Sequence, residues 1–329
     1  MDKDWDIIVV GGGIAGLTAT ALLLKLGLKV LCIEPQKPPS QEKFETSDLR
    51  STAYLVKAID LLKEAGLSGP PETLDDLVEY AKKLTKRDGS GNIIQEGTAF
   101  DGGIGQTHHF WREVLVRHYG GQPYSDDGQK IAYNNDAGVK ALTYLTDFEK
   151  THKTTSNGFM NRGQDGFAAG KVGLYIDGSF RISKFVKAEG LNFSISELPG
   201  HNGTRYNFSS FWANALSSKA KGEKKEAAAK FLAYLTSDEA MQVWLDTVGE
   251  LPAKPSVALV DANKQHDLYG PFIRGLDYAT ATTFISEKPQ RQSVVDAYDM
   301  VVLQGMSAKD AIAKVAKKEQ ELLDDFFGN

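Results

Sequence analysis

The stretch that decides the fold reads Phe167-Ala-Ala-Gly-Lys-Val-Gly-Leu-Tyr-Ile-Asp-Gly-Ser-Phe180. Its apolar centre predicts a short strand at 172–176, and the Asp177-Gly178 pair predicts a turn directly after that strand. A second short strand is expected at 193–196, and helical patterns fill most of the chain around the two. The sequence therefore predicts an α/β protein that is rich in helices.

Capping signals predict where several helices begin and end. Thr73, with Asp76 three residues further on, is expected to begin a helix that runs to Lys83. Gly66 is expected to end a helix over 58–65, because glycine readily adopts the conformation that closes a helix. Further amphipathic helices are expected at 137–150, 224–235, 237–248 and 307–327.

The first fifty residues have a different pattern, in which two apolar runs flank a glycine-rich loop. The runs at 6–10 and 29–34 predict two buried parallel strands, with a helix over 14–26 between them. The loop has the spacing Gly11-x-Gly13-x-x-Gly16 and follows the first strand directly. This order of elements predicts a partial Rossmann-type βαβ unit.

The glycine spacing is typical of a dinucleotide-binding loop. Gly11 allows the tight turn, Gly13 lets a pyrophosphate approach the backbone, and Gly16 lets the helix pack against the strand. Glu34, at the end of the second strand, is placed to accept hydrogen bonds from ribose hydroxyls. These four residues are the predicted cofactor contacts of the βαβ unit.

A neighbouring segment, Asp48-Leu-Arg-Ser-Thr-Ala53, resembles the arginine-containing segment of FAD-dependent hydroxylases of the ubiquinone-biosynthesis type. The resemblance implies that Arg50 helps to hold FAD; a solvated loop arginine is the alternative. These hydroxylases also have a second FAD motif built on a Gly-Asp pair, and no glycine of this sequence precedes an aspartate. The resemblance therefore implies an FAD-binding fragment over 1–56 for which hydroxylase activity is not expected.

From about Lys57 onward, ordered blocks resemble extracellular solute-binding proteins (family 1) of sugar-importing ABC transporters, the group that includes maltose-binding-like proteins. The blocks lie at 62–67, 70–77, 167–180, 231–240 and 249–257. Leu74 replaces the tryptophan that is usual in the second block. The resemblance implies a periplasmic-binding-protein-like (type II) α/β lobe over 57–329, with an incomplete first lobe, because the N-terminal segment replaces much of that lobe.

The resemblance and the chemistry of sugars together predict the ligand-binding residues. Sugars present apolar C–H faces to aromatic rings and hydroxyls to polar side chains. The predicted contacts are His108, Trp111, Asp177, Phe180, Trp212, Asn214, Glu250 and Arg291. Phe180 stands where the family often has a stacking tryptophan. Turn formation is the alternative role for Asp177, and a surface position is the alternative for Arg291.

Bulk composition argues against several other functions. A net charge of −5 does not suit a surface for nucleic-acid phosphates. The longest apolar stretch, at 14–24, is shorter than the roughly 20 residues of a membrane helix. His108 and His109 would point about 100° apart on a helix, so a shared metal is not expected. Cys32 is the single cysteine, which excludes a disulfide within the chain.

The start of the sequence bears on location. Residues 1–6 contain three acids, whereas a secretory signal begins with a basic segment. The solute-binding family is periplasmic, but the chain as written is expected to stay in the cytoplasm.

The function favoured by the sequence is the sugar-binding component of an ABC carbohydrate importer, truncated and impaired. A small-molecule sugar and a transporter permease are the expected partners, the chain is expected to be a monomer, and this part requires no cofactor. The alternatives are an FAD-dependent monooxygenase and a non-functional fusion. The two resemblances meet within 54–67, which suggests a chimera.

Overall fold

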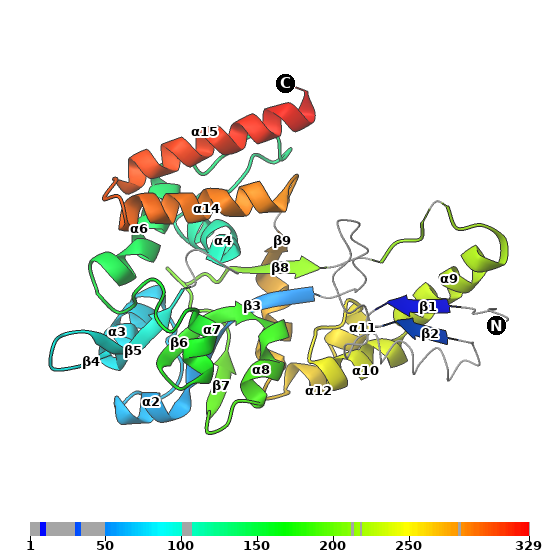
Figure 1. Ribbon diagram of the computed structural model, residues 1–329, viewed down its shortest axis with the longest axis horizontal. Helices are drawn as coiled ribbons and strands as arrows, with labels where there is room; N and C mark the ends of the chain where they lie inside the picture. Colours follow the sequence, from blue (N-terminus) through cyan, green and yellow to red (C-terminus); the bar gives the residue numbers. More distant parts are fainter. Residues whose placement is uncertain are drawn as a thin grey trace. The chain divides into compact units, whose positions relative to one another are not determined.

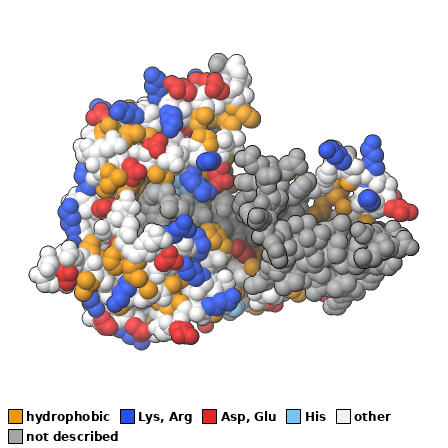
Figure 2. Space-filling model, in the orientation of Figure 1, with side chains coloured by type: hydrophobic (Ala, Val, Ile, Leu, Met, Phe, Trp, Pro, Cys, Tyr) orange, Lys and Arg blue, Asp and Glu red, His pale blue; other side chains and the backbone are white. Residues whose placement is uncertain are grey.

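The computed structural model describes residues 7–10, 30–33, 50–100, 107–211, 214–217, 219–281 and 284–328. The chain forms two compact units (Figure 1). The first unit comprises residues 1–50 and 211–258, and the second unit comprises residues 51–210 and 259–329. On the face drawn in Figure 2, the acidic and basic side chains of the described residues are intermingled rather than gathered into one charged patch.

A sheet of seven strands, counted over the described residues, organises the second unit. Its order is β4-β5-β6-β3-β8-β9, and β7 also pairs with β3. Its strands are β3 (Arg50–Ala58), β4 (Lys86–Arg87), β5 (Ile93–Ala99), β6 (Val172–Gly178), β7 (Phe193–Ser196), β8 (Asn207–Phe211) and β9 (Ala279–Ala281). The expected strands at 172–176 and 193–196 are thus confirmed.

Strand β3 lies inside this sheet. It runs antiparallel to β6, with Lys57 opposite Leu174, and antiparallel to β7, with Lys57 opposite Ser194. The segment in which the sequence suggested an FAD-holding arginine is therefore the start of a paired strand. The predicted boundary between the FAD-binding fragment (1–56) and the solute-binding region (57–329) falls within β3. That the two parts come from different families stays a prediction.

Helices of the second unit surround the sheet. They are α2 (Ile59–Glu64), α3 (Leu74–Leu84), α4 (Thr107–His109), η1 (Phe110–Leu115), α5 (Val116–His118), α6 (Asp136–Lys150), α7 (Gly163–Ala168), η2 (Ser179–Arg181), α8 (Ile182–Val186), α12 (Asp261–Lys264), α13 (Gly270–Gly275), η3 (Leu276–Tyr278), α14 (Glu287–Val302) and α15 (Ala308–Phe327). Helices α14 and α15 run side by side, and both pack on α6 (Figure 1).

The capping predictions are confirmed for several helices. The Thr73 hydroxyl accepts from the Asp76 N–H and the Asp76 carboxylate accepts from the Thr73 N–H, both at 3.0 Å. Ser307 caps α15 in the same way, by accepting from the N–H of Asp310 at 3.1 Å. Local hydrogen bonds of this kind satisfy N–H groups that a helix start leaves without partners, so they are readable from sequence alone.

The described part of the first unit holds a strand pair and three helices. Strands β1 (Ile7–Val10) and β2 (Val30–Ile33) pair in parallel, with Ile7 opposite Val30, as the predicted βαβ unit requires. The helices are α9 (Gly222–Leu235), α10 (Asp238–Val248) and α11 (Pro255–Ala258). None of the described helices, in either unit, is long and apolar enough to cross a membrane.

Candidate ligand-binding site

A buried helix carries the first predicted contact. Elements α4, η1 and α5 follow one another without a break over 107–118, and we call this segment the histidine helix. Its middle, η1, is π-helical: the Val116 N–H donates to the carbonyl of Trp111, five residues back. All six residues of η1 are buried. Single π-helical turns are rare and frequently lie at functional sites, and a helix buried on every side must pair its polar groups inside the protein.

Two adjacent histidines lie at the amino end of the histidine helix. His108 is 2% exposed and His109 is 4% exposed. The ring of His109 stacks on that of Phe208 from β8, with centroids 4.6 Å apart. Phe284 lies 5.6 Å from the His108 ring and 5.5 Å from the His109 ring. The two phenyl rings thus give the histidine pair an apolar border.

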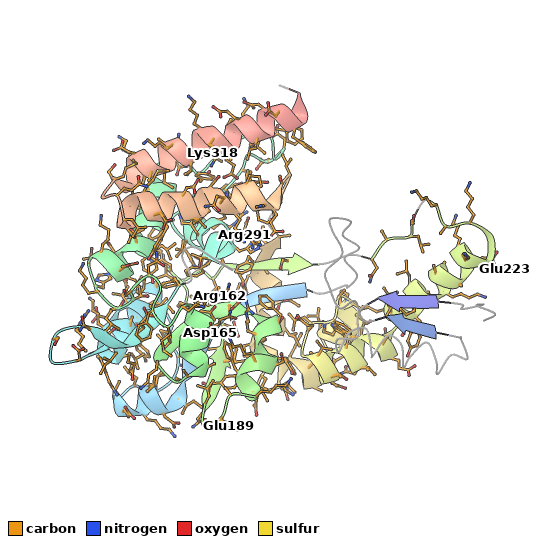
Figure 3. All side chains as sticks on the ribbon, viewed as in Figure 1. Arg162, Asp165, Glu189, Glu223, Arg291 and Lys318 are labelled. Atoms are coloured by element: carbon orange, nitrogen blue, oxygen red, sulfur yellow. The ribbon has the colours of Figure 1, made fainter. Side chains whose placement is uncertain are left out.

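Arg291 adds a positive charge to this group. It lies near the start of α14 (Figure 3), where its guanidinium pairs with the carboxylate of Glu287 one turn earlier. Its buried Nε has no hydrogen-bond partner among the described residues. The charge of Arg291 acts on both His108 and His109. Helix α14 packs on α4, so the structure brings two of the predicted contacts, His108 and Arg291, from distant parts of the chain onto neighbouring elements.

The electrostatic setting keeps the imidazoles neutral. Burial, together with smaller contributions from the charges of Arg291 and Arg112, lowers the pKa of His109 to about 3. Burial, His109 and the same two arginines hold the pKa of His108 well below its ordinary value. A neutral imidazole has one N–H donor and one acceptor nitrogen, as a hydroxyl has one donor and acceptor lone pairs. Both ring nitrogens of His108 lack a partner among the described residues.

The contacts predicted near the decisive stretch form a separate group. The Asp177 carboxylate accepts from the Tyr175 hydroxyl at 2.9 Å, the Gly178 N–H at 2.7 Å and Arg181 Nε at 3.0 Å. Burial raises the pKa of Asp177, against the effect of Arg181. Phe180 packs under the Arg181 guanidinium, 5.0 Å from the ring centre. Asp177 and Gly178 are the last residues of β6, opposite Tyr54 and Ala53, so the turn predicted at this pair is wrong; the chain leaves the strand only at Ser179.

The other predicted contacts have varied settings. Trp111 is 1% exposed and meets Tyr133 edge to face at 4.9 Å, within the hydrophobic core. Asn214 and Glu250 belong to the first unit, and Glu250 is buried directly after Gly249, whose left-handed backbone ends α10. Trp212 lies outside the described residues.

The predicted cofactor contacts fall largely outside the described part of the chain. This holds for Gly11, Gly13, Gly16 and Glu34, and for the side chain of Arg50, whose backbone begins β3. Within the described residues, no group of three His, Cys, Asp or Glu side chains could hold a metal.

Sequence reasoning missed His109, Phe208 and Phe284 as members of the site. His109 was considered only as a metal ligand, although its neighbour was a predicted sugar contact. Phe208 and Phe284 carry no local signal, because only the packing of β8 and of the segment before α14 brings them to the histidine pair.

Comparison with known families identifies the class of protein. Residues 50–268, two thirds of the chain, match the family "Bacterial extracellular solute-binding protein". The chain therefore belongs to that family. Residues 4–88 also match the FAD binding domain, so the two matches overlap over 50–88, a range that contains the predicted join at 54–67. No curated protein sequence matches the chain significantly.

Solved structures with the same fold are solute-binding proteins. An ABC solute-binding protein of Thermotoga lettingae bound with alpha-D-tagatose has a TM-score of 0.72 at 18% identity, over 96% of this chain and 99% of that chain. A substrate-binding protein of Listeria monocytogenes in complex with cycloalternan has a TM-score of 0.75 at 15% identity, over 98% of this chain and 99% of that chain. A maltose/maltodextrin-binding domain of Bdellovibrio bacteriovorus bound to maltotriose has a TM-score of 0.73 at 16% identity, over 96% of this chain and 98% of that chain.

These likenesses establish the periplasmic-binding-protein-like α/β fold. They cover nearly all of this chain, so they include most of the N-terminal segment, in which the sequence predicted a βαβ unit of the FAD-binding type. All three proteins are described as binding proteins and not as enzymes.

Proposed function

We propose that this chain is the carbohydrate-binding component of an ABC importer. The observation that carries the proposal is the buried pair His108 and His109 beside Phe284, in which both ring nitrogens of His108 lack a partner among the described residues, in a member of a solute-binding family. Tagatose, cycloalternan and maltotriose, the ligands of three proteins with this fold, are all carbohydrates. The ligand class of this chain is inferred from that agreement and from the chemistry of the site.

The site suits a neutral ligand that is rich in hydroxyls. The ring nitrogens of His108 can donate one hydrogen bond and accept another, which matches what a sugar hydroxyl offers. Arg291 supplies further donors, and Phe284 supplies an apolar surface for C–H groups. Phe180, in the same unit, remains a predicted contact of this ligand, whereas Trp212, Asn214 and Glu250 stay sequence-based predictions.

The affinity is expected to be lower than that of relatives with an unaltered N-terminal lobe. In this family the ligand is trapped by closure of two domains around it, so a replaced N-terminal segment removes contacts of the closed state. The permease of the importer is the proposed protein partner, and the chain is proposed to act as a monomer. Its location is proposed as periplasmic from its family, against the cytoplasmic location that its acidic first residues predicted. Co-purification with the permease tests the partner, size-exclusion chromatography tests the monomer state, and cell fractionation tests the location.

A matched pair of variants tests the site. His108→Phe keeps a ring of similar size but removes both nitrogens, whereas His118→Phe makes the same change at the other end of the histidine helix. We expect His108→Phe to weaken binding of maltotriose, tagatose or cycloalternan at least about fivefold, because each lost hydrogen bond is worth about 1 kcal/mol. His118→Phe should bind as wild type does. Equal affinities of the two variants, measured by calorimetry, would contradict the proposal.

A second candidate function, flavin binding by the N-terminal segment, is favoured by the match to the FAD binding domain over 4–88. The parallel pairing of β1 with β2 is the described feature that fits it, because the glycine loop of a βαβ unit presents its backbone N–H groups between two such strands. A purified chain that carries flavin absorbance would support this function. A colourless chain that binds no added FAD would contradict it, and one that also binds no carbohydrate would be a non-functional fusion.

A further inference from the structure

A buried ion pair lies behind the candidate site. Arg112 Nη2 is 2.7 Å from Glu319 Oε2, and both side chains are 0% exposed. Glu319 also accepts from the hydroxyls of Tyr124 and Tyr133, each at 2.7 Å. The guanidinium lies 5.5 Å from the centre of the Tyr133 ring and 5.7 Å from that of Tyr124. The tyrosine hydroxyls thus satisfy Glu319, whereas Arg112 Nε and Nη1 have no hydrogen-bond partner among the described residues and the guanidinium lies near aromatic rings instead, which is a favourable contact for a cation.

Gln290 connects this ion pair to the first turn of α14. Its backbone carbonyl accepts from Arg112 Nη2 at 2.7 Å. Its side-chain nitrogen donates to the Tyr124 hydroxyl at 2.8 Å and to Glu319 at 3.3 Å. Its side-chain oxygen accepts from the N–H groups of Ile285 and Ser286, at 2.9 and 3.0 Å. One residue thus joins three helices and the segment that leads into α14.

The side chain of Gln290 determines where α14 begins. Ser286 occupies the N-cap position, but its hydroxyl makes no capping hydrogen bond. The Gln290 side chain instead reaches back to two N–H groups that precede the first turn, as the glutamine or glutamate of a capping box does. Pro289 fits in this turn because its missing N–H would have had no partner there.

The residues fixed in this way belong to the candidate site. Arg291 follows Gln290 directly, and Phe284 precedes Ile285. Both act on the histidine pair, Phe284 through ring contacts and Arg291 through its charge. Arg112 lies one turn after His108 on the histidine helix. The ion pair and Gln290 therefore hold the two sides of the site, the histidine helix and the start of α14, at a fixed spacing.

We propose that Gln290, with the Arg112–Glu319 ion pair, is a positioning residue of the ligand-binding site that holds Arg291 and Phe284 against His108 and His109. The inference rests on the proposed carbohydrate site for its functional meaning. The anchoring itself depends only on contacts within the second unit, so it can be measured without a ligand.

The test compares Gln290→Leu with Gln292→Leu. Gln292 lies on the same helix, is exposed, and donates from its side chain to Asp296 alone among the described residues, at 2.8 Å. In the unliganded protein, Gln290→Leu should speed hydrogen exchange of the Ile285 and Ser286 amides at least tenfold. It should also move the pKa of His109 upward, measured by NMR of the ring, since Arg291 is released. Gln292→Leu should change neither. Wild-type exchange rates and an unmoved His109 pKa in Gln290→Leu would overturn the proposal.

Carbohydrate affinity provides the functional arm. We expect Gln290→Leu to bind about tenfold more weakly than wild type and Gln292→Leu to bind equally well. If the wild-type chain binds no carbohydrate, the proposed function fails, whereas the exchange and pKa readouts still decide the anchoring. Faster exchange with unchanged affinity would overturn the positioning role.

A double variant covers the outcome in which Gln290→Leu does not fold. Arg112→Met with Glu319→Leu replaces the ion pair by apolar side chains of similar volume, a change that often leaves stability unaltered. We expect this variant to fold, to exchange the Ile285 amide faster, and to lose affinity about tenfold. A folded double variant with wild-type exchange and affinity would contradict the proposal.

Discussion

The two ends of the histidine helix carry the same side chain in different surroundings. At the amino end, His108 and His109 lie against Phe284 and feel the charge of Arg291. This end also meets the segment that leads into α14, which Gln290 holds in place. The histidine pair at this end thus has a cation and an apolar ring as neighbours.

At the carboxyl end the neighbours are different. His118 meets Tyr206 edge to face at 5.1 Å and His201 at 6.0 Å. Burial, together with a smaller contribution from His201, lowers the pKa of His118 to about 4. Burial thus keeps the imidazoles neutral at both ends, but a cation with a buried, unpartnered nitrogen stands beside the histidines only at the amino end, among the described residues. Neutral histidine alone does not mark a ligand site; the neighbours distinguish the two ends.

The largest effect is expected from removing half of the buried ion pair. Glu319→Leu leaves the charge of Arg112 in the core without its partner. Loss of one partner of a buried pair costs about 3–5 kcal/mol, so urea unfolding should shift by that amount. Lys254→Ala, which breaks an exposed ion pair with Asp238, should cost about 1 kcal/mol or less. Similar losses in the two variants would show that the ion pair does not hold the histidine helix.

The pH dependence of stability gives the next largest effect. The pKa of His118 is lowered from 6.5 to about 4 in the folded protein, so between these values the unfolded chain binds a proton that the folded chain does not. Stability should therefore fall as pH falls from about 6.5 to about 4, by up to about 1.4 kcal/mol per pH unit for this group. Urea unfolding of His118→Asn over this range should show a slope smaller by one proton. A pH dependence of stability in His118→Asn equal to that of the wild type would show that His118 is not a group whose pKa is lowered on folding.

Arg291→Met should affect the amino end alone. It removes the donors and the charge of Arg291 but keeps an unbranched apolar stem, so carbohydrate affinity should fall about tenfold. The pKa of His109 should rise, because the repulsion from Arg291 is gone. It should stay below its ordinary value, because burial remains. NMR of the histidine rings measures this change, with His118 as the internal control. A His109 pKa equal to that of wild type would remove Arg291 from the site.

The smallest effect is expected at the carboxyl end. His201→Ala removes the charge that contributes to the low pKa of His118, so that pKa should rise slightly, while burial keeps it below its ordinary value. Carbohydrate affinity should not change. A loss of affinity in His201→Ala would contradict the assignment of the ligand site to the amino end of the histidine helix.

Local signals made part of the fold predictable. Thr73 and Asp76, and Ser307 for α15, act within one turn of a helix, so the sequence predicted where these helices begin. Strand β3 was not predicted, because a strand is defined by its partners and β6 and β7 lie more than a hundred residues further along the chain. The FAD-type segment before it also favoured another interpretation.

The same limit applies to the candidate site. His108 and Arg291 were predicted singly from a family resemblance, and no sequence feature indicated that they meet. Their proximity depends on the buried contacts of Arg112, Glu319 and Gln290, which join three distant helices. Trp111 was predicted as a contact because it lies at the start of a helix where the family places sugar contacts, yet its ring packs against Tyr133 in the core.

The most direct test of the carbohydrate site is a titration of the wild-type protein with maltotriose, tagatose and cycloalternan, followed by NMR of the histidine rings. Weak binding remains visible in such spectra. We predict that the signals of His108 and His109 shift to saturation with at least one of these carbohydrates, while those of His118 and His201 stay in place. Four unmoved histidine signals with all three ligands, or shifts confined to His118 and His201, would contradict the account.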